Sequence, residues 1–325
     1  MSLSPQDEIP TWGQLPAEQY LIRHWDPASP EPPDQQRIHL IKDFLNLDQI
    51  PEELDPTWLG NRPWEQSPQT RTPTEGEIAT ILRPWRSDRL RITAWKLWKE
   101  GADDDQPVLL RTYYDADDDD RVKGWATLSE YYQEVSHWAV LDDPELFDFE
   151  GQGVGWQQVF SILPELSKVG ERYSRRINSQ WIGPFLTDFK DGLDAVKRQL
   201  PSWRRNFNRL VTENPATGSL LYFVSTTQVL IADKETFKTD KLLLVFLDAK
   251  QNITMQGRIE ITEERFDQLS VDWGLRKHPD DVCDEGTIGQ GYLVNGEAGK
   301  QLYQCTEQDL QGFDHAQTPQ GIHQR

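Results

Sequence analysis

Residues 241–248 read KLLLVFLD, and six consecutive apolar residues fill positions 242–247 of this stretch. A continuous apolar run of this length is typical of a β-strand that is buried on both faces. Short polar turns separate it from further strand-like runs, which are SLLYFVS (219–225), TQVLIAD (227–233) and ITMQGRIEI (253–261). The pattern therefore predicts a mostly antiparallel β-meander with residues 241–248 as a central strand.

Outside the meander, helical patterns predominate. Apolar residues recur at helical spacing in QRIHLIKDFLNL (36–47) and in much of 156–211. A short helix is expected at 16–25, where proline suits the first turn. Thr74 and Glu77 have the spacing of a capping box, which predicts a helix start at that point. Further helices are expected after Thr262 and after the glycine-rich segment 286–300.

A second strand region is indicated by RLRITAWKLW (89–98). Its Leu90, Ile92 and Ala94 alternate with polar residues, which is the period of a half-buried strand. The run VLLRTYY (108–114) follows after an acidic loop and also reads as a strand. Together these two runs predict a β-hairpin in the N-terminal half.

The order of these elements predicts the α+β class, with helical segments and a β-hairpin in the N-terminal half and helices followed by the meander in the C-terminal half. The segment GQGVG (151–155) breaks the pattern, and the sequence changes there from acidic to locally basic. We expect a largely irregular segment at 1–35, an acidic α+β region at 36–150, a helical and then β-meander region at 151–310, and a disordered tail at 311–325.

The charge balance restricts the classes of partner. The 325 residues carry a formal net charge of -20, and such a surface repels the phosphates of nucleic acids and of anionic membranes. Aromatic residues reach 10%, with 13 tryptophans, so the chain is not a disordered polymer. We therefore expect a protein partner, of basic character, and neither general nucleic-acid binding nor membrane association.

The cysteine content and the first residues of the chain indicate the cellular compartment in which we expect the protein. Cys283 and Cys305 are the two cysteines, which is too few for a disulfide framework in a chain of this length. The first thirty residues lack the basic and apolar regions of a signal peptide, and no apolar run has the length of a bilayer span. The expected location is the cytoplasm.

One set of residues suggests hydrolytic chemistry. Asp233 ends one predicted strand, and Asp248 and Lys250 end the next, so the chain contains a D…DxK pattern on adjacent strands. The pattern resembles the core of the PD-(D/E)xK nuclease group, and the resemblance implies acids that bind Mg²⁺ and a lysine that helps to activate water. No proline precedes Asp233, and DAKQN (248–252) also has the composition of a hairpin turn, which is the alternative interpretation.

Clustered acids and irregularly placed tryptophans suggest a binding surface instead. The acidic runs lack the spacing of an EF-hand, and the Cys/His residues lack the spacing of a zinc site, so we expect no metal site and no cofactor. Tryptophans in proline-rich sequence are candidates for contact residues, although they could also pack on the body. The predicted binding residues are Asp117, Asp118, Asp119, Asp120, Trp58 and Trp64.

Two hypotheses about function follow. The first is a non-enzymatic protein-binding or regulatory protein that presents acidic groups to a partner. The alternative is a divalent-metal-dependent, nuclease-like hydrolase that uses Asp233, Asp248 and Lys250. The arrangement of those three side chains in space distinguishes the two hypotheses.

Overall fold

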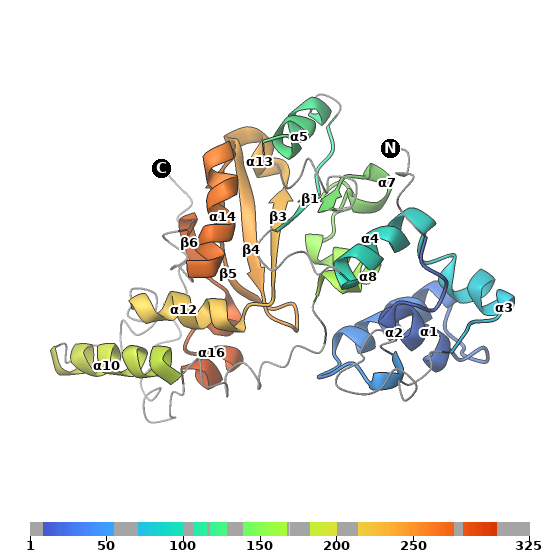
Figure 1. The fold of residues 1–325 in the computed structure, drawn as a ribbon, viewed down its shortest axis with the longest axis horizontal. Helices are drawn as coiled ribbons and strands as arrows, with labels where there is room; N and C mark the ends of the chain where they lie inside the picture. The colour runs from blue at the N-terminus through green and yellow to red at the C-terminus, as the bar shows by residue number, and fades with distance from the viewer. Residues whose placement is uncertain are drawn as a thin grey trace.

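The computed structural model describes residues 9–54, 71–99, 107–115, 118–128, 139–167, 169, 183–199, 214–275 and 282–303. Within these ranges helices accompany a six-stranded mixed sheet, and the expected α+β class is confirmed (Figure 1). The strands are β1 (Val108–Arg111), β2 (Val140–Leu141), β3 (Thr227–Ala232), β4 (Lys241–Leu247), β5 (Ile253–Glu260) and β6 (Asp284–Ile288).

The helices of the N-terminal part precede or surround the first two strands. They are α1 (Pro16–His24), α2 (Pro33–Leu45), the 3₁₀ turn η1 (Glu52–Leu54), α3 (Glu75–Glu77), the π-helical turn η3 (Ile78–Leu82), α4 (Asp88–Lys99), α5 (Asp119–Ala126) and α7 (Pro144–Phe147). The expected helices at 16–25 and 36–47 are confirmed. The capping box is also confirmed, because the Thr74 hydroxyl accepts from the Glu77 N–H while the Glu77 carboxylate accepts from the Thr74 N–H.

The later helices flank the remaining strands. They are the 3₁₀ turn η4 (Trp156–Gln158), α8 (Val159–Ile162), the 3₁₀ turn η5 (Pro164–Leu166), α10 (Gly183–Gln199), α12 (Pro215–Val224), α13 (Lys234–Thr239), α14 (Glu263–Leu275), the 3₁₀ turn η7 (Gln290–Tyr292) and α16 (Glu297–Leu302). The helix expected after Thr262 and the short last helix are therefore present.

The strand order is β2-β1-β3-β4-β5-β6. β3, β4, β5 and β6 pair antiparallel in succession, as the meander predicts, whereas β1 pairs parallel with both β2 and β3. The sheet as a whole is therefore mixed, and it takes strands from both sides of residue 150. β4 lies between β3 and β5 with most of its residues buried, so the run 241–248 is the central strand that its composition indicates.

The expected N-terminal hairpin is wrong. Residues 88–99 form α4, and the strand that follows pairs with β2 and β3 rather than with the segment before it. Leu90, Ala94 and Leu97 also recur at i, i+4 and i+7, so the same apolar residues fit a helix. The alternation was misleading because Arg91, which it assigns to a solvent face, is 1% exposed and forms an ion pair in the interior.

The run 219–225 also differs from expectation. It belongs to α12, whose start is fixed by Asn214, because the side chain of that residue accepts a hydrogen bond from the Ala216 N–H and Pro215 occupies the first turn. Tyr222 of this helix packs on Phe246 of β4, with 5.2 Å between ring centroids. The apolar composition that indicates a strand therefore belongs to a helix that is covered by the sheet.

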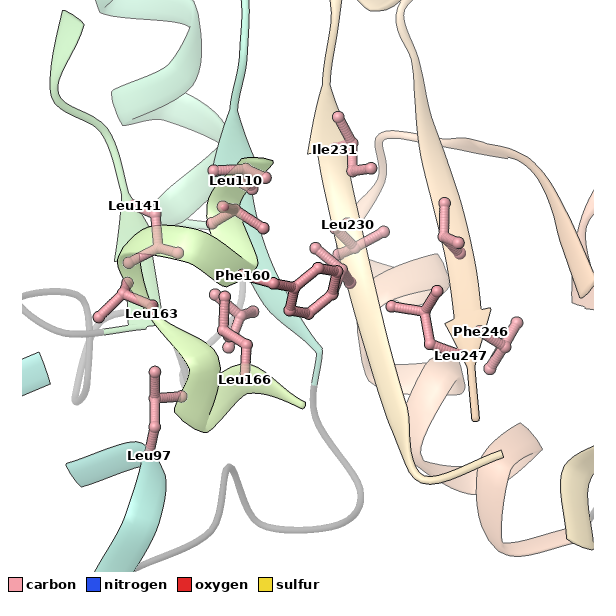
Figure 2. Close-up of a cluster of buried hydrophobic side chains, with 14 of the residues drawn as sticks. Leu97, Leu110, Leu141, Phe160, Leu163, Leu166, Leu230, Ile231, Phe246 and Leu247 are labelled. Atoms are coloured by element: carbon pink, nitrogen blue, oxygen red, sulfur yellow. The ribbon is translucent and has the colours of Figure 1, made fainter. Parts of the chain in front are cut away.

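The core joins the N-terminal helices to the sheet. Phe160 of α8 and Leu166 of η5 lie in one cluster of buried side chains with Leu110 of β1, Leu230 of β3 and Leu247 of β4 (Figure 2). This cluster fixes the position of the sheet edge at which β1 and β2 lie.

Two buried ion pairs connect the start of α4 to η5 and to α1. Arg86 donates to both oxygens of Glu165, at 3.0 and 2.7 Å, and Arg91 donates to Glu18 at 2.7 Å. Both guanidinium groups stack on tryptophan rings at 3.6 Å, Arg86 on Trp85 and Arg91 on Trp12. Trp12 therefore packs back on the body.

Candidate functional site

The carboxyl ends of β2, β1 and β3 lie at the same end of the sheet, because the three strands are parallel. In open sheets, ligands commonly bind outside the carboxyl ends of parallel strands, so this edge is the first place to look for a site. In Figure 1 the helices α5 and α13 stand at the same end. Arg121 of α5 joins them by donating to the Phe237 carbonyl at 2.9 Å, and the Trp125 and Phe237 rings lie 5.3 Å apart.

Carboxylates from three separate chain segments gather at this end of the sheet. We call this surface the acidic edge. Its members are Asp115, Asp118, Asp119, Asp120, Asp142, Asp143, Glu145, Glu150, Glu235 and Asp240. Several ion pairs and hydrogen bonds connect the segments. Arg121 forms ion pairs with both Asp118 and Asp240, and the Glu150 carboxylate accepts from the Lys234 N–H at 3.0 Å.

Arg111, the last residue of β1, lies at the centre of this edge and is 2% exposed. Its Nη1 donates to Asp119 at 2.7 Å and lies 3.4 Å from Asp142, while its Nε donates to the Tyr113 carbonyl at 3.0 Å. Its guanidinium also lies 4.3 Å from the centre of the Tyr114 ring. A buried cation thus holds carboxylates from α5 and from the end of β2 beside one another.

This arrangement shifts the pKa values of two neighbouring side chains. The hydrogen bond from Arg111 lowers the pKa of the Asp119 carboxyl, so this group stays ionised to lower pH than usual. Burial, and then the charge of Asp142, raise the pKa of Tyr114 far above its usual range. Tyr114 therefore keeps its proton, donates to the Arg111 carbonyl at 3.3 Å and accepts from the Asp143 N–H at 2.9 Å.

The predicted acidic run 117–120 divides into different roles. Asp117 lies outside the described residues, as do Trp58 and Trp64. Asp118 pairs with Arg121 at 3.1 Å and has a side chain that is 15% exposed, whereas Asp119 keeps 62% of its side chain exposed while it pairs with Arg111. Asp120 is 99% exposed, with Lys123 3.5 Å away. Asp118 and Asp119 therefore help to build the edge, and Asp119 and Asp120 present charge to solvent.

Asp233 and Asp248, which the nuclease-like alternative would bring together, lie apart. β3 and β4 are antiparallel, with Thr227 opposite Leu247 and Ile231 opposite Leu243. Asp233 therefore lies at one end of the pair and Asp248 at the other, about 20 Å apart at the rise of a strand. Residues at the ends of two consecutive strands lie at the same end of the sheet only when the strands are parallel.

Asp233 has a structural role at the acidic end. Its side chain accepts from the Thr236 N–H and so caps α13, and it also accepts two hydrogen bonds from Arg258, at 2.7 and 2.5 Å. Burial by itself would raise the pKa of Asp233, but Arg258 and the capping bond together hold it below its usual value. The pair thus stabilises the fold at neutral pH, and this contribution is lost as pH falls through the lowered pKa.

Asp248 holds the turn between β4 and β5, as the alternative interpretation of DAKQN suggests. Its carboxylate accepts from the Lys250 N–H, from the Asn252 N–H and side-chain amide, and from the Tyr292 hydroxyl, at 2.7 to 3.0 Å. Lys250 points away to the Asn46 carbonyl and pairs with Asp48 at 3.1 Å.

We expect Asp248→Ala to lower the free energy of unfolding by about 3 kcal/mol, because it leaves buried donors without an acceptor. Asp248→Asn keeps one acceptor oxygen and should cost clearly less. Urea unfolding followed by circular dichroism measures both values. Equal stability of Asp248→Ala and the wild type would show that this turn does not depend on the carboxylate.

Sequence reasoning missed Arg111, Asp142 and Asp143. One sequence feature could have identified Arg111 as a site residue, because a charged residue there directly continues the apolar run VLL (108–110). Among the described residues no group of three or more His, Cys, Asp or Glu side chains is arranged to hold a metal ion. Cys283 is buried, and His278, Cys305 and His315 lie outside the described ranges.

Comparisons with protein-family models, curated proteins and solved structures gave no match to this chain. The described helices include none with the length and apolar character needed to cross a membrane.

Proposed function

We propose that this chain is a non-enzymatic protein-binding or regulatory protein, and that the acidic edge docks a basic segment of its partner. The observation that carries the proposal is the gathering of carboxylates from residues 115 and 118–120, 142–150 and 235–240 at one end of the sheet. Several of them are largely exposed, with side-chain exposures of 99% for Asp120, 74% for Asp240 and 62% for Asp119.

The ten carboxylates of the acidic edge outnumber the six cations that lie among them, which are Arg89, Arg111, Arg121, Lys123, Lys234 and Lys238. Arg111 is buried under the edge, and Arg121 is shared between Asp118 and Asp240. Exposed pairs such as Asp120 with Lys123 contribute little to stability, so their charges remain available to a partner. A surface of one sign attracts a segment of the opposite sign and raises its association rate, and the net charge of -20 reinforces the effect.

The test compares two sets of acid-to-amide substitutions in an affinity capture from cells of the source organism. The edge variant combines Asp115→Asn, Asp120→Asn and Glu145→Gln, all at exposed positions. The control variant combines Glu31→Gln, Asp43→Asn and Glu53→Gln, which are also exposed and lie around α2. Both variants lose the same charge, and both leave the buried ion pairs intact.

We expect the wild type and the control variant to retain the same basic protein, identified by mass spectrometry, and the edge variant to lose most of it. Capture that is equal for the edge variant and the wild type would contradict docking at this edge. Failure of the wild type to capture any protein above background would also count against the proposal.

A further inference from the structure

The strand β6 ends the sheet on the side opposite to β2, and no described strand lies beyond it (Figure 1). We call this side the open side of β6. Its other side pairs antiparallel with β5. Asp284, Glu285 and Thr287 of β6 are exposed, whereas the central strand β4 is mostly buried. A strand in this position presents main-chain N–H and C=O groups with which another extended chain can pair.

The main-chain groups on the open side belong to Gly286 and Ile288. The Gly289 N–H donates to the Thr254 carbonyl at 3.0 Å, which marks this position of the antiparallel ladder as hydrogen-bonded. Hydrogen-bonded and non-hydrogen-bonded positions alternate, so Ile288, opposite Met255, and then Gly286 turn their N–H and C=O groups away from β5. Neither residue makes a main-chain hydrogen bond to a described residue outside β5.

Carboxylates surround the single lysine at the start of β6. Lys241 of β4 forms an ion pair with Asp284, and Glu260 at the end of β5 lies opposite Lys241. The hydrogen bond to Asp284, and then the charges of Asp284, Glu260 and Glu285, raise the pKa of Lys241. The three carboxylates therefore exceed the charge of this lysine, and the start of the open side is acidic.

This charge decides which kind of chain fits the open side. The pairing partner of Asp284 on β5 is Arg258, but its guanidinium is held by two hydrogen bonds to Asp233. A second copy of this chain is repelled, because each copy carries a net charge of -20. A segment with basic residues is attracted, and an extended one gains main-chain hydrogen bonds as well.

We propose that an extended, lysine-containing segment of a protein partner adds to β6 as a further antiparallel strand. Its main chain pairs with Gly286 and Ile288. Because it runs antiparallel to β6, its carboxyl end lies beside the start of that strand, where its lysines face Asp284 and Glu285. The inference goes beyond the proposed function, since this contact lies at the opposite side of the sheet from β2 and uses no member of the acidic edge.

A synthetic peptide provides the probe. Valine and threonine alternate along it, and two lysines follow at its carboxyl end. Amide hydrogen exchange, followed by NMR on the full chain, shows which N–H groups the peptide covers. We expect the N–H groups of Gly286 and Ile288 to exchange rapidly in the free protein and at least about tenfold more slowly at saturating peptide. The exchange of Thr287, whose main chain faces β5, should not change.

Two variants at one position locate the contact. Ile288→Pro removes an outward N–H and no bond to β5, and proline is tolerated on the open side of an edge strand. Ile288→Ala loses the same side chain and keeps the N–H, so it is the matched control. We expect the peptide affinity, measured by fluorescence anisotropy, to fall about tenfold in Ile288→Pro and less than about twofold in Ile288→Ala.

Modified peptides give the same test on the unaltered protein. Methylation of alternate peptide nitrogens removes the donors on one side of the added strand only. Of the two complementary methylated peptides, one should therefore lose binding and the other should keep it. A peptide with glutamate in place of both lysines should bind at least about tenfold more weakly than the lysine peptide.

Each contrary result has a distinct meaning. Unchanged exchange of Gly286 and Ile288, or equal affinity of the two methylated peptides, overturns strand addition at β6. Equal affinity of the lysine and glutamate peptides overturns the basic occupant. The edge variant should bind the lysine peptide as the wild type does, and loss of the peptide in that variant would place it at the acidic edge instead. Docking at the acidic edge is decided separately, by the affinity capture.

Discussion

Val245→Asp should unfold the sheet. Val245 is fully buried in β4, where it pairs with Val229 of β3 and with Gln256 of β5. Burial of a carboxylate without a partner costs several kcal/mol, which is comparable to the whole stability of a domain. Thermal unfolding followed by circular dichroism should show no cooperative transition, because the variant is already unfolded at physiological temperature.

The control for this substitution is made at the pairing partner of Val245 on the neighbouring strand β5. Gln256 is half-buried, so Gln256→Asp places the same carboxylate on the neighbouring strand with access to water. We expect a folded protein with a modest decrease in melting temperature. If Val245→Asp keeps the wild-type melting temperature, then β4 is not the centre of the core.

Arg91→Met should lower the free energy of unfolding by about 3–5 kcal/mol, because it leaves the Glu18 charge buried without compensation. The side chains of Arg91 and Glu18 are 1% and 0% exposed. Arg91 also donates to the Pro10 carbonyl at 2.7 Å, and Glu18 accepts from the Gly13 N–H at 2.7 Å. The pair thus fastens the segment before α1 to α4, and chemical denaturation measures its loss.

Two further variants interpret that result. Lys238→Met breaks an exposed ion pair with Glu235 and should change stability by less than about 1 kcal/mol. A double variant that also carries Glu18→Met removes both buried charges and should recover part of the loss, since an apolar pair avoids the desolvation cost. If Arg91→Met is as stable as Lys238→Met, the buried pair does not hold the N-terminal segment in place.

The meander could be predicted because its determinants are local. Residues 227–261 alternate apolar runs with short turns, and each strand pairs with its neighbour in sequence. The pairing of β1 was not predictable in this way, because its partners β2 and β3 are distant in the chain. Periodicity also predicted a strand where α4 lies, because the polar residue Arg91 occupies an interior position of that helix.

The same distinction applies to the candidate site. The acidic run at 118–120 is visible in the sequence, and the structure places it in the acidic edge. Its neighbours Arg111 and Asp142 are 31 residues apart and meet because β1 and β2 are parallel. Asp233 and Asp248 end consecutive strands, and only the direction of those strands decides whether they meet.

The dependence of the association rate on ionic strength tests docking at the acidic edge most directly. The measurement uses the captured partner in stopped-flow experiments at low and high salt, with the wild type, the edge variant and the control variant. For the wild type and the control, we predict a rate constant that falls by about tenfold or more as salt rises, and for the edge variant a low rate already at low salt. Association rates that depend neither on salt nor on the edge substitutions would contradict the account.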